Sequence, residues 1–189
     1  MRKRYIAFVF GLVALLMYLA LDTISPSKQR EATAILEPDY IIQGLQAEYY
    51  SAEGLLNQQI DAQSARHLPE TNQTLFEQPS VIIRKGTTPE WGMRAASGLL
   101  TANQQLSLSG SVQVVPLSDN QAAYSLTTEK LDIDLRQEIA ETAELVLIEG
   151  VGTELQARGM HLNFKEQQAR FNAEVRGRHD PKAEAQITQ

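Results

Sequence analysis

The chain contains no cysteine among its 189 residues. It therefore has no disulfide framework, no thiolate zinc or iron–sulfur site, no cysteine nucleophile and no lipidated cysteine. Basic residues are also in the minority, because 17 Lys and Arg stand against 23 Asp and Glu, for a formal net charge of −6. A nucleic-acid-binding domain is normally basic, so that class is disfavoured. A hydrophobic fraction of 43% nevertheless supports a folded core.

Acidic residues are absent from the first 21 positions. A basic triplet at residues 2–4 precedes residues 5–21, an apolar run without charge or proline. A helix of this length rises about 25 Å, close to the thickness of a bilayer core. The triplet then stays cytoplasmic and the remainder is exported. A cleaved signal peptide is the alternative, although its small-x-small site is missing, since Tyr18 stands two positions before Ala20.

An N-terminal membrane helix divides the chain into five expected segments. Residues 22–38 contain two prolines, mixed charges and no periodicity, which is typical of a linker. We expect a cytoplasmic stub at 1–4, a transmembrane helix at 5–21, a linker at 22–38, a β-domain at 39–178 and a C-terminal tail at 179–189.

Apolar and polar residues alternate with period two from about residue 39 onward. Turn-forming groups recur between these stretches about every ten residues. Half-polar strands at this spacing predict an all-β antiparallel sandwich, roll or barrel. The alternation is clearest in residues 43–50, 91–95, 106–114, 131–136 and 169–176.

The segment 136–150 allows two interpretations. Its glutamates at 138, 141 and 144 lie three apart, and Ile139, Ala143 and Leu147 can form a helical stripe. The flanks 131–135 and 145–148 alternate as strands do. We expect strands here and keep a helix as the alternative.

No catalytic or metal-binding pattern is found in the sequence. The three histidines are far apart, and Asp132 and Asp134 lack the glycine and third acid of a calcium loop. Gly150 and Gly152 lack the third glycine of a dinucleotide site. The sequence therefore indicates a binding or structural role, with no catalytic residue, metal or cofactor.

The apolar inner face of such a roll permits two arrangements. The residues alone favour a closed core, but two splayed sheets would turn the same face into a groove for lipid chains. An open roll also leaves unpaired edge strands, which can accept a strand of another protein.

Several short stretches together form a pattern that resembles one family. They are residues 47–50, 53–54, 75–79, 89–91, 106–112, 126–128 and 149–150. Their order and spacing, the chain length and the single expected N-terminal helix are similar to the LptC family of lipopolysaccharide export proteins, over essentially the whole chain.

The resemblance implies an open periplasmic β-jellyroll of two splayed sheets, anchored in the inner membrane by one transmembrane helix with a cytoplasmic N-terminus. Such a protein receives lipopolysaccharide from the LptB, LptF and LptG transporter in a hydrophobic groove and passes it to LptA. LptF and LptG meet the transmembrane helix and the first strand, and LptA meets the last strand. The protein hydrolyses no ATP itself.

Two other functions remain open. One is a structural scaffold that assembles envelope partners by strand addition without binding lipid. The other is an anchored envelope hydrolase, which rests only on export and a cleft-forming fold.

The resemblance also assigns residues to roles. It implies groove positions at Leu45, Phe76 and Ala169, and the apolar strand faces add Ala47, Tyr49, Trp91, Met93 and Phe171. Plain core packing is the alternative for these side chains. Gly150 matches a family glycine associated with complex assembly, with a positive-φ turn glycine as the alternative. Along the last strand, the interface with LptA is expected at Arg170, Asn172 and Glu174.

Charge constrains how lipopolysaccharide is bound. Subtracting the three positive charges of residues 2–4 from −6 leaves −9 for the remainder. An anionic lipid is repelled at long range by such a domain, although salt screens this beyond about 8 Å. We therefore expect binding to rest on burial of the acyl chains, at about 0.8 kcal/mol per methylene.

Overall fold

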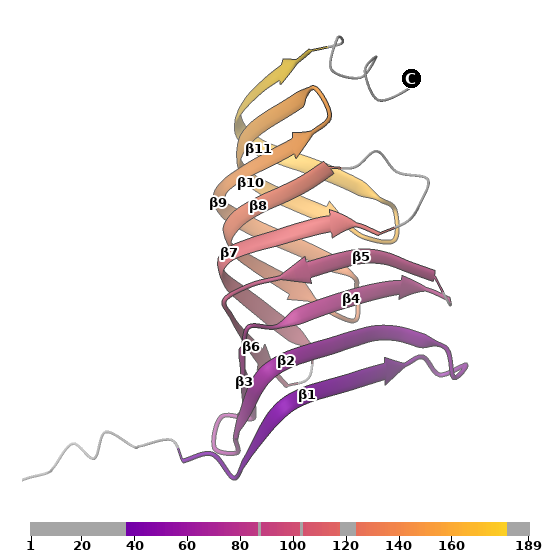
Figure 1. Cartoon of the computed structure of the whole chain (residues 1–189), viewed down its shortest axis with the longest axis vertical. Coiled ribbons are helices and arrows are strands. Elements are labelled where there is room, and N and C mark those ends of the chain that lie inside the picture. Colours follow the sequence, from indigo (N-terminus) through magenta and orange to yellow (C-terminus); the bar gives the residue numbers. More distant parts are fainter. Residues whose placement is uncertain (1–36, 87, 103, 118–123, 181–189) are drawn as a thin grey trace, which may run out of the picture. The chain divides into compact units, whose positions relative to one another are not determined.

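The computed structural model describes residues 37–86, 88–102, 104–117 and 124–180 (Figure 1). All the regular elements in these ranges are β-strands. The described residues contain no helix that is long and apolar enough to cross a membrane. The transmembrane helix expected at 5–21 lies outside the described residues. The strands are β1 Tyr40–Tyr50, β2 Leu56–Leu68, β3 Gln73–Glu77, β4 Ser80–Lys85, β5 Thr88–Arg94, β6 Ser97–Thr101, β7 Gln105–Pro116, β8 Tyr124–Asp134, β9 Ile139–Gly150, β10 Thr153–Asn163 and β11 Gln168–His179.

Two long strands act as branch points between a pair of sheets. Residues 58–61 of β2 pair with β4, and residues 64–68 pair with β3. Likewise, residues 105–109 of β7 pair with β6, and residues 113–116 pair with β5. The short strands β4 and β5 therefore belong to one sheet, sheet I, and β3 and β6 to the other, sheet II. The remaining strands are long and run through both sheets, and all pairings are antiparallel.

The long strands bend along a line, which we call the crease, where they pass from one sheet to the other. Left-handed backbone marks this line at Gly44, Gly110, Gly159 and Glu174, with φ between 51° and 81°. Register shifts at the same level in β7, β9 and β11 mark β-bulges, which sharpen the bend. The strand ends away from the crease form a rim, which we call the mouth (Figure 1).

Side chains from the inner faces of both sheets fill the middle of the jellyroll. Along β7, buried Leu106 and Leu108 alternate with partly exposed Ser107 and Ser109, as the period of two predicts. Each fully buried aliphatic or aromatic side chain contributes about 1.5–3 kcal/mol. The largest buried members include Ile60, Ile83, Met93, Leu106, Leu108, Leu131, Ile133, Met160 and Phe164.

The structure confirms the all-β antiparallel jellyroll and decides the ambiguous segment 136–150. The helical alternative is wrong, because β8 ends at Asp134 and β9 begins at Ile139. The Asp134 carboxylate ends β8 by accepting hydrogen bonds from the backbone N–H of Arg136 at 2.9 Å and of Gln137 at 2.8 Å. The segment is therefore a turn followed by a strand.

Candidate functional site

The expected groove residues divide into a buried group and a peripheral group. Phe76, Trp91 and Met93 lie in the filled middle, each with 6% or less of its surface exposed. In this structure these three side chains belong to the hydrophobic core. The peripheral group comes from the strands at the two ends of the sheets: Leu45, Ala47, Tyr49 and Phe171 pack partly buried against the core, and Ala169 is exposed.

The first strand places its apolar residues over the core. Leu45 pairs with Ala62 and Ala47 pairs with Ile60, and both partners are buried. Burial raises the pKa of the Tyr49 phenol above its usual range, with a smaller contribution from Tyr40. Tyr49 therefore stays neutral at every physiological pH, as a side chain on an apolar wall should.

The last strand continues the same apolar wall on the other side. Phe171 pairs with buried Met160, and Ala169 pairs with buried Leu162. Because no further strand covers β11 among the described residues, these side chains keep part of their surface open to solvent. The apolar interior is thus continuous through the middle and reaches the surface at both ends.

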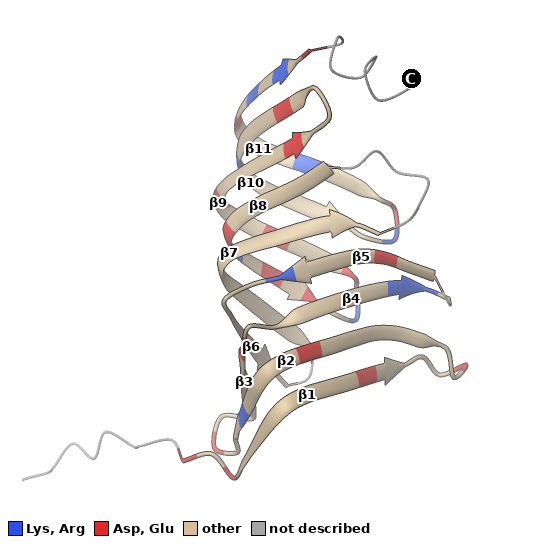
Figure 2. Cartoon of the chain, in the orientation of Figure 1, with Lys and Arg blue, Asp and Glu red and all other residues tan. Residues whose placement is uncertain are grey.

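Each end of the sheets is a free edge among the described strands. β1 pairs with β2 alone, and β11 pairs with β10 alone. A free edge presents unpaired N–H and C=O groups, which can pair with another strand. Figure 2 shows basic residues on β11, where the sequence has Arg170, Arg176 and Arg178.

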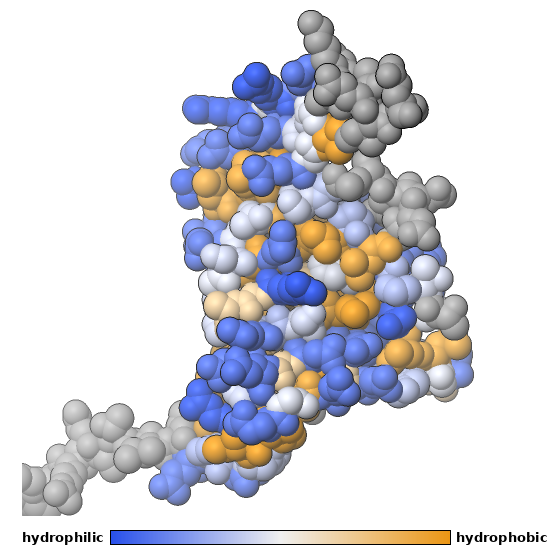
Figure 3. Space-filling view, viewed as in Figure 1, coloured by the Kyte–Doolittle hydropathy of each residue, from blue (hydrophilic) through white to orange (hydrophobic). Residues whose placement is uncertain are grey.

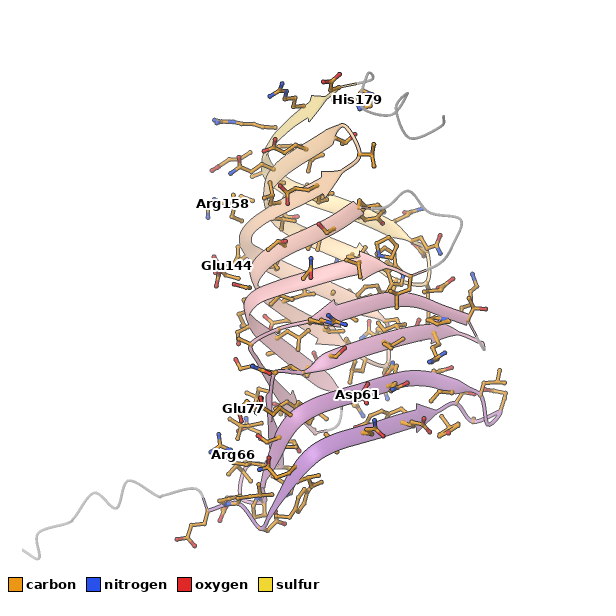
Figure 4. All side chains as sticks on the ribbon, in the orientation of Figure 1. Asp61, Arg66, Glu77, Glu144, Arg158 and His179 are labelled. Carbon is orange, nitrogen blue, oxygen red and sulfur yellow. The ribbon has the colours of Figure 1, made fainter. Side chains whose placement is uncertain are left out.

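The expected interface residues on β11 are exposed and partly engaged within the chain. The Glu174 carboxylate lies 3.6 Å from the Arg158 guanidinium, and Arg170 is the register partner of His161. The side chain of Asn172 lies against Gly159 on the neighbouring strand. Arg158, labelled in Figure 4, therefore marks where β11 is held at the crease.

Gly150 ends β9, where it pairs with Tyr124 of β8 and Thr153 of β10. The left-handed backbone in the following turn falls on Gly152, with a φ of 65°, and not on Gly150. The turn-glycine alternative for Gly150 is therefore wrong, because this position does not require positive φ.

The mouth holds a cluster of charged side chains. The side chains of Glu90 and Glu138 are only 13% and 15% exposed, and each lies near one lysine, Lys85 at 3.8 Å and Lys165 at 3.9 Å. Burial raises the pKa of Glu138, Lys165 lowers it, and the Glu90 carboxylate adds a smaller increase. The mouth is therefore a polar rim around an apolar interior.

The described part of the chain shows no arrangement for metal chemistry. No group of three or more His, Asp or Glu side chains there can hold a metal ion. Each histidine contacts a neighbouring acid or hydroxyl instead: His67 lies 2.8 Å from Asp39, His161 lies 2.8 Å from Glu141, and His179 lies 3.0 Å from Thr153.

The outer face of sheet I carries a shallow apolar depression, and hydrophobic residues appear on this face in Figure 3. Its lining includes Ile82, Gly92, Val115 and Leu117. Leu117 covers Gly92, because a Cβ at that glycine would lie 3.1 Å from the Leu117 Cδ1 atom. The depression faces away from the core and does not join the interior.

A family model described as "Lipopolysaccharide-assembly, LptC-related" matches residues 6–180. The chain belongs to this LptC-related family. The lipopolysaccharide export system protein LptC of Escherichia coli K12 is 24% identical over 178 residues, which are 92% of each chain, and LptC of Shigella flexneri gives the same values.

The LptC-related chain also has a similar solved structure. The match is the crystal structure of LptH from Pseudomonas aeruginosa, described as the LptA homologous periplasmic component of the conserved lipopolysaccharide transport device. The TM-score is 0.52 at 7% identity, over 66% of this chain and 95% of the other. This likeness supports the jellyroll fold.

Two residues that the alternating pattern of the sequence places on apolar strand faces close the interior of this LptC-related domain. Leu135 and Phe164 lie in hairpin turns, yet they are 5% and 1% exposed. Turns are normally read as solvated. The alternation through residues 131–136 and from Leu162 to Phe164 predicts their burial, whereas their position just beyond the strand ends was not predicted.

Proposed function

We propose that this chain carries lipopolysaccharide within the envelope transport machine, as its family membership suggests. It receives the lipid from the LptB, LptF and LptG transporter and passes it to LptA. The single observation that carries the proposal is the apolar interior that runs through the jellyroll and reaches both free edges. A neighbouring jellyroll added at either edge would extend this interior, and acyl chains could pass along it without entering water.

The two edges suggest an order of partners. β1 follows the segment expected to lie in the membrane, so it is placed to meet LptF, with LptG contacting the transmembrane helix. β11 lies at the other end of the strand order, and this supports LptA as its partner. This arrangement requires an inner-membrane, single-pass topology with the jellyroll in the periplasm.

Photo-crosslinking tests the path. A photoreactive amino acid at Leu45 near one edge, or at Phe171 near the other, should capture lipopolysaccharide in proteoliposomes that contain the transporter and ATP. Capture at Leu45 should rise before capture at Phe171. The matched control is Asp132, whose carboxylate lies 3.0 Å from Lys130. Equal labelling at all three positions would refute an interior path.

The scaffold function remains the second candidate, because it needs only the two free edges. It predicts that substitutions at Leu45 and Phe171 leave transport unchanged while strand-breaking substitutions in β11 abolish LptA binding. Transport lost at both kinds of site favours the lipid-carrying function.

A further inference from the structure

The two sheets contact one another directly at the mouth, opposite the crease. The indole of Trp91 in sheet I lies against the ring of Phe164 in the β10–β11 turn, with centroids 5.5 Å apart. Beside it, the Gln167 side-chain amide donates to the Glu90 carboxylate at 3.3 Å. Deeper in, the Gln58 side-chain amide donates to the backbone carbonyl of Leu135 in the β8–β9 turn.

These three contacts each join sheet I to a hairpin turn of sheet II. We call the set the clasp: Gln58, Glu90 and Trp91 on one side, and Leu135, Phe164 and Gln167 on the other. Because Leu135 and Phe164 are buried, the turns plug the interior from the side. With the clasp closed, an acyl chain has no lateral route to the core.

The charges around the clasp oppose its closure. Glu90 and Glu138 are two poorly exposed carboxylates whose mutual repulsion is felt at Glu138. Their lysine partners are more than half exposed and lie near 4 Å, a distance at which a solvated pair contributes little. The apolar packing between Trp91 and Phe164 and the buried hydrogen bond from Gln58 to Leu135 are therefore the contacts that keep the clasp shut.

The indole N–H of Trp91 is an unpaired hydrogen-bond donor at the mouth. Its indole is 3% exposed, and among the described residues its N–H has no hydrogen-bond partner. A buried polar group left unpaired costs free energy and calls for an explanation. An ester, amide or hydroxyl oxygen of an acyl chain lying at the mouth would supply the missing acceptor.

We propose that the mouth is a gated uptake site for acyl chains, in which the clasp parts to admit the chain and the Trp91 indole N–H then donates to an oxygen near the head of that chain. This inference rests on the proposed lipid-carrying function. It adds a lateral gate and a polar recognition point that packing alone would not require.

A reversible lock tests the gate. The chain has no native cysteine, so the full-length double variant Glu90→Cys/Gln167→Cys can be joined by a short bis-methanethiosulfonate linker. In proteoliposomes with the transporter and ATP, the locked protein should lose at least 90% of lipopolysaccharide capture at Phe171, on the far side of the clasp from the β1 edge, and regain it on reduction. The matched control is Arg94→Cys/Gln113→Cys, a register pair within sheet I on the same strand as Glu90.

The outcomes of the locking experiment separate the gate from the lipid-carrying function. Unchanged capture in the locked protein overturns the gate and leaves the lipid-carrying function standing. No capture in the unlocked protein overturns that function and the gate together. A Gln167→Ala variant, which leaves the core untouched, should load about two- to fivefold faster, and a rate equal to that of the unsubstituted protein also counts against the gate.

The recognition point needs its own variant. Trp91→Phe keeps an aromatic ring against Phe164 but removes the N–H, and it should weaken lipopolysaccharide binding about three- to tenfold, the range of one hydrogen bond. Thermal unfolding checks that the fold is retained. Equal affinity of a folded Trp91→Phe protein would overturn the role of the indole.

Discussion

The side chain of Asn172 on β11 packs directly against the backbone of Gly159 on β10, in the space that a side chain at position 159 would need. A Cβ built at Gly159 would be 2.7 Å from the Asn172 Nδ2 atom and 3.2 Å from its Cβ atom. Gly159 also has a φ of 73°, which disfavours any other L-residue. The contact fixes the last strand at the crease, close to its bulge between residues 173 and 176.

Gly159→Ala should therefore lower the free energy of unfolding by about 2 kcal/mol or more, since backbone strain and a steric contact add together. Gly54→Ala is the matched control, because Gly54 has a φ of 79° but an open surrounding, and it should lose only about 1 kcal/mol. Urea unfolding measures both. Equal losses would show that Asn172 moves aside freely.

Glu138 should make the protein less stable as the pH rises. Its pKa is raised in the folded state, so the folded chain binds this proton more tightly than the unfolded chain does. The associated penalty is absent below the unfolded pKa of about 4.5 and develops as the pH rises through the folded pKa. Glu138→Gln should thus gain stability relative to the parent at pH 7 and show little gain at pH 4.

The pKa of Asp134 is shifted in the opposite direction to that of Glu138, so its variant should show the opposite dependence of stability on pH. Hydrogen bonds from the backbone N–H of Gln137, and less strongly from that of Arg136, lower the pKa of its carboxyl group. The stability it contributes is present above the unfolded pKa of about 3.8 and is lost as the pH falls through the folded pKa. Asp134→Asn should therefore be costly at pH 7, and the cost should shrink as the pH falls below about 3.8. Parallel pH profiles for Asp134→Asn and Glu138→Gln would contradict both assignments.

Phe164 should matter more for stability than its position in a turn indicates. It is 1% exposed and contacts Trp91, so Phe164→Ala should cost about 3–5 kcal/mol. Phe171→Ala, on the edge strand and only partly buried, should cost less than half of that. Trp91 is the single tryptophan of the chain, so its fluorescence follows both unfolding transitions. Similar losses would mean that the turn is not part of the core.

Proline scanning of the last strand separates folding from partner binding. Neighbouring residues of an edge strand point their N–H groups alternately to the adjacent strand and to the free edge. Of Ala169→Pro and Arg170→Pro, one should lower stability, and the other should keep stability but abolish co-purification of LptA. Both side chains are exposed, so lost packing does not confuse the comparison. LptA binding retained by both variants would exclude β11 as the interface.

Much of the fold was predictable from the sequence because burial imposes a period of two. Leu106 and Leu108 are buried between serines as their alternation predicted, and the turn at Glu53-Gly54 joins β1 to β2. The bend between the sheets was not predictable, because it depends on bulges whose extra residue, such as Ser111, has no distinctive side chain. The β3–β4 turn was missed for a related reason, since Gln78 adopts a φ of 49° without being glycine.

The expected groove shows where sequence reasoning stops. Alternation places Leu45, Ala47 and Tyr49 on one face, and that face does lie over the core. Alternation cannot tell whether the opposing sheet touches that face, which depends on long-range contacts such as that between Trp91 and Phe164. Openness is therefore a tertiary property, and the residue pattern leaves it undetermined.

The two free edges are chemically unlike, and this gives the molecule a direction. β1 carries Glu48 as its only charged residue and exposes Tyr40 and Ile41, whereas β11 carries three arginines and one glutamate. Two copies joined through the same edge would set like charges against each other, whereas unlike edges attract. A head-to-tail contact between unlike edges leaves one free edge of each kind, so a row of such domains grows with a fixed direction, like a polymer of asymmetric subunits.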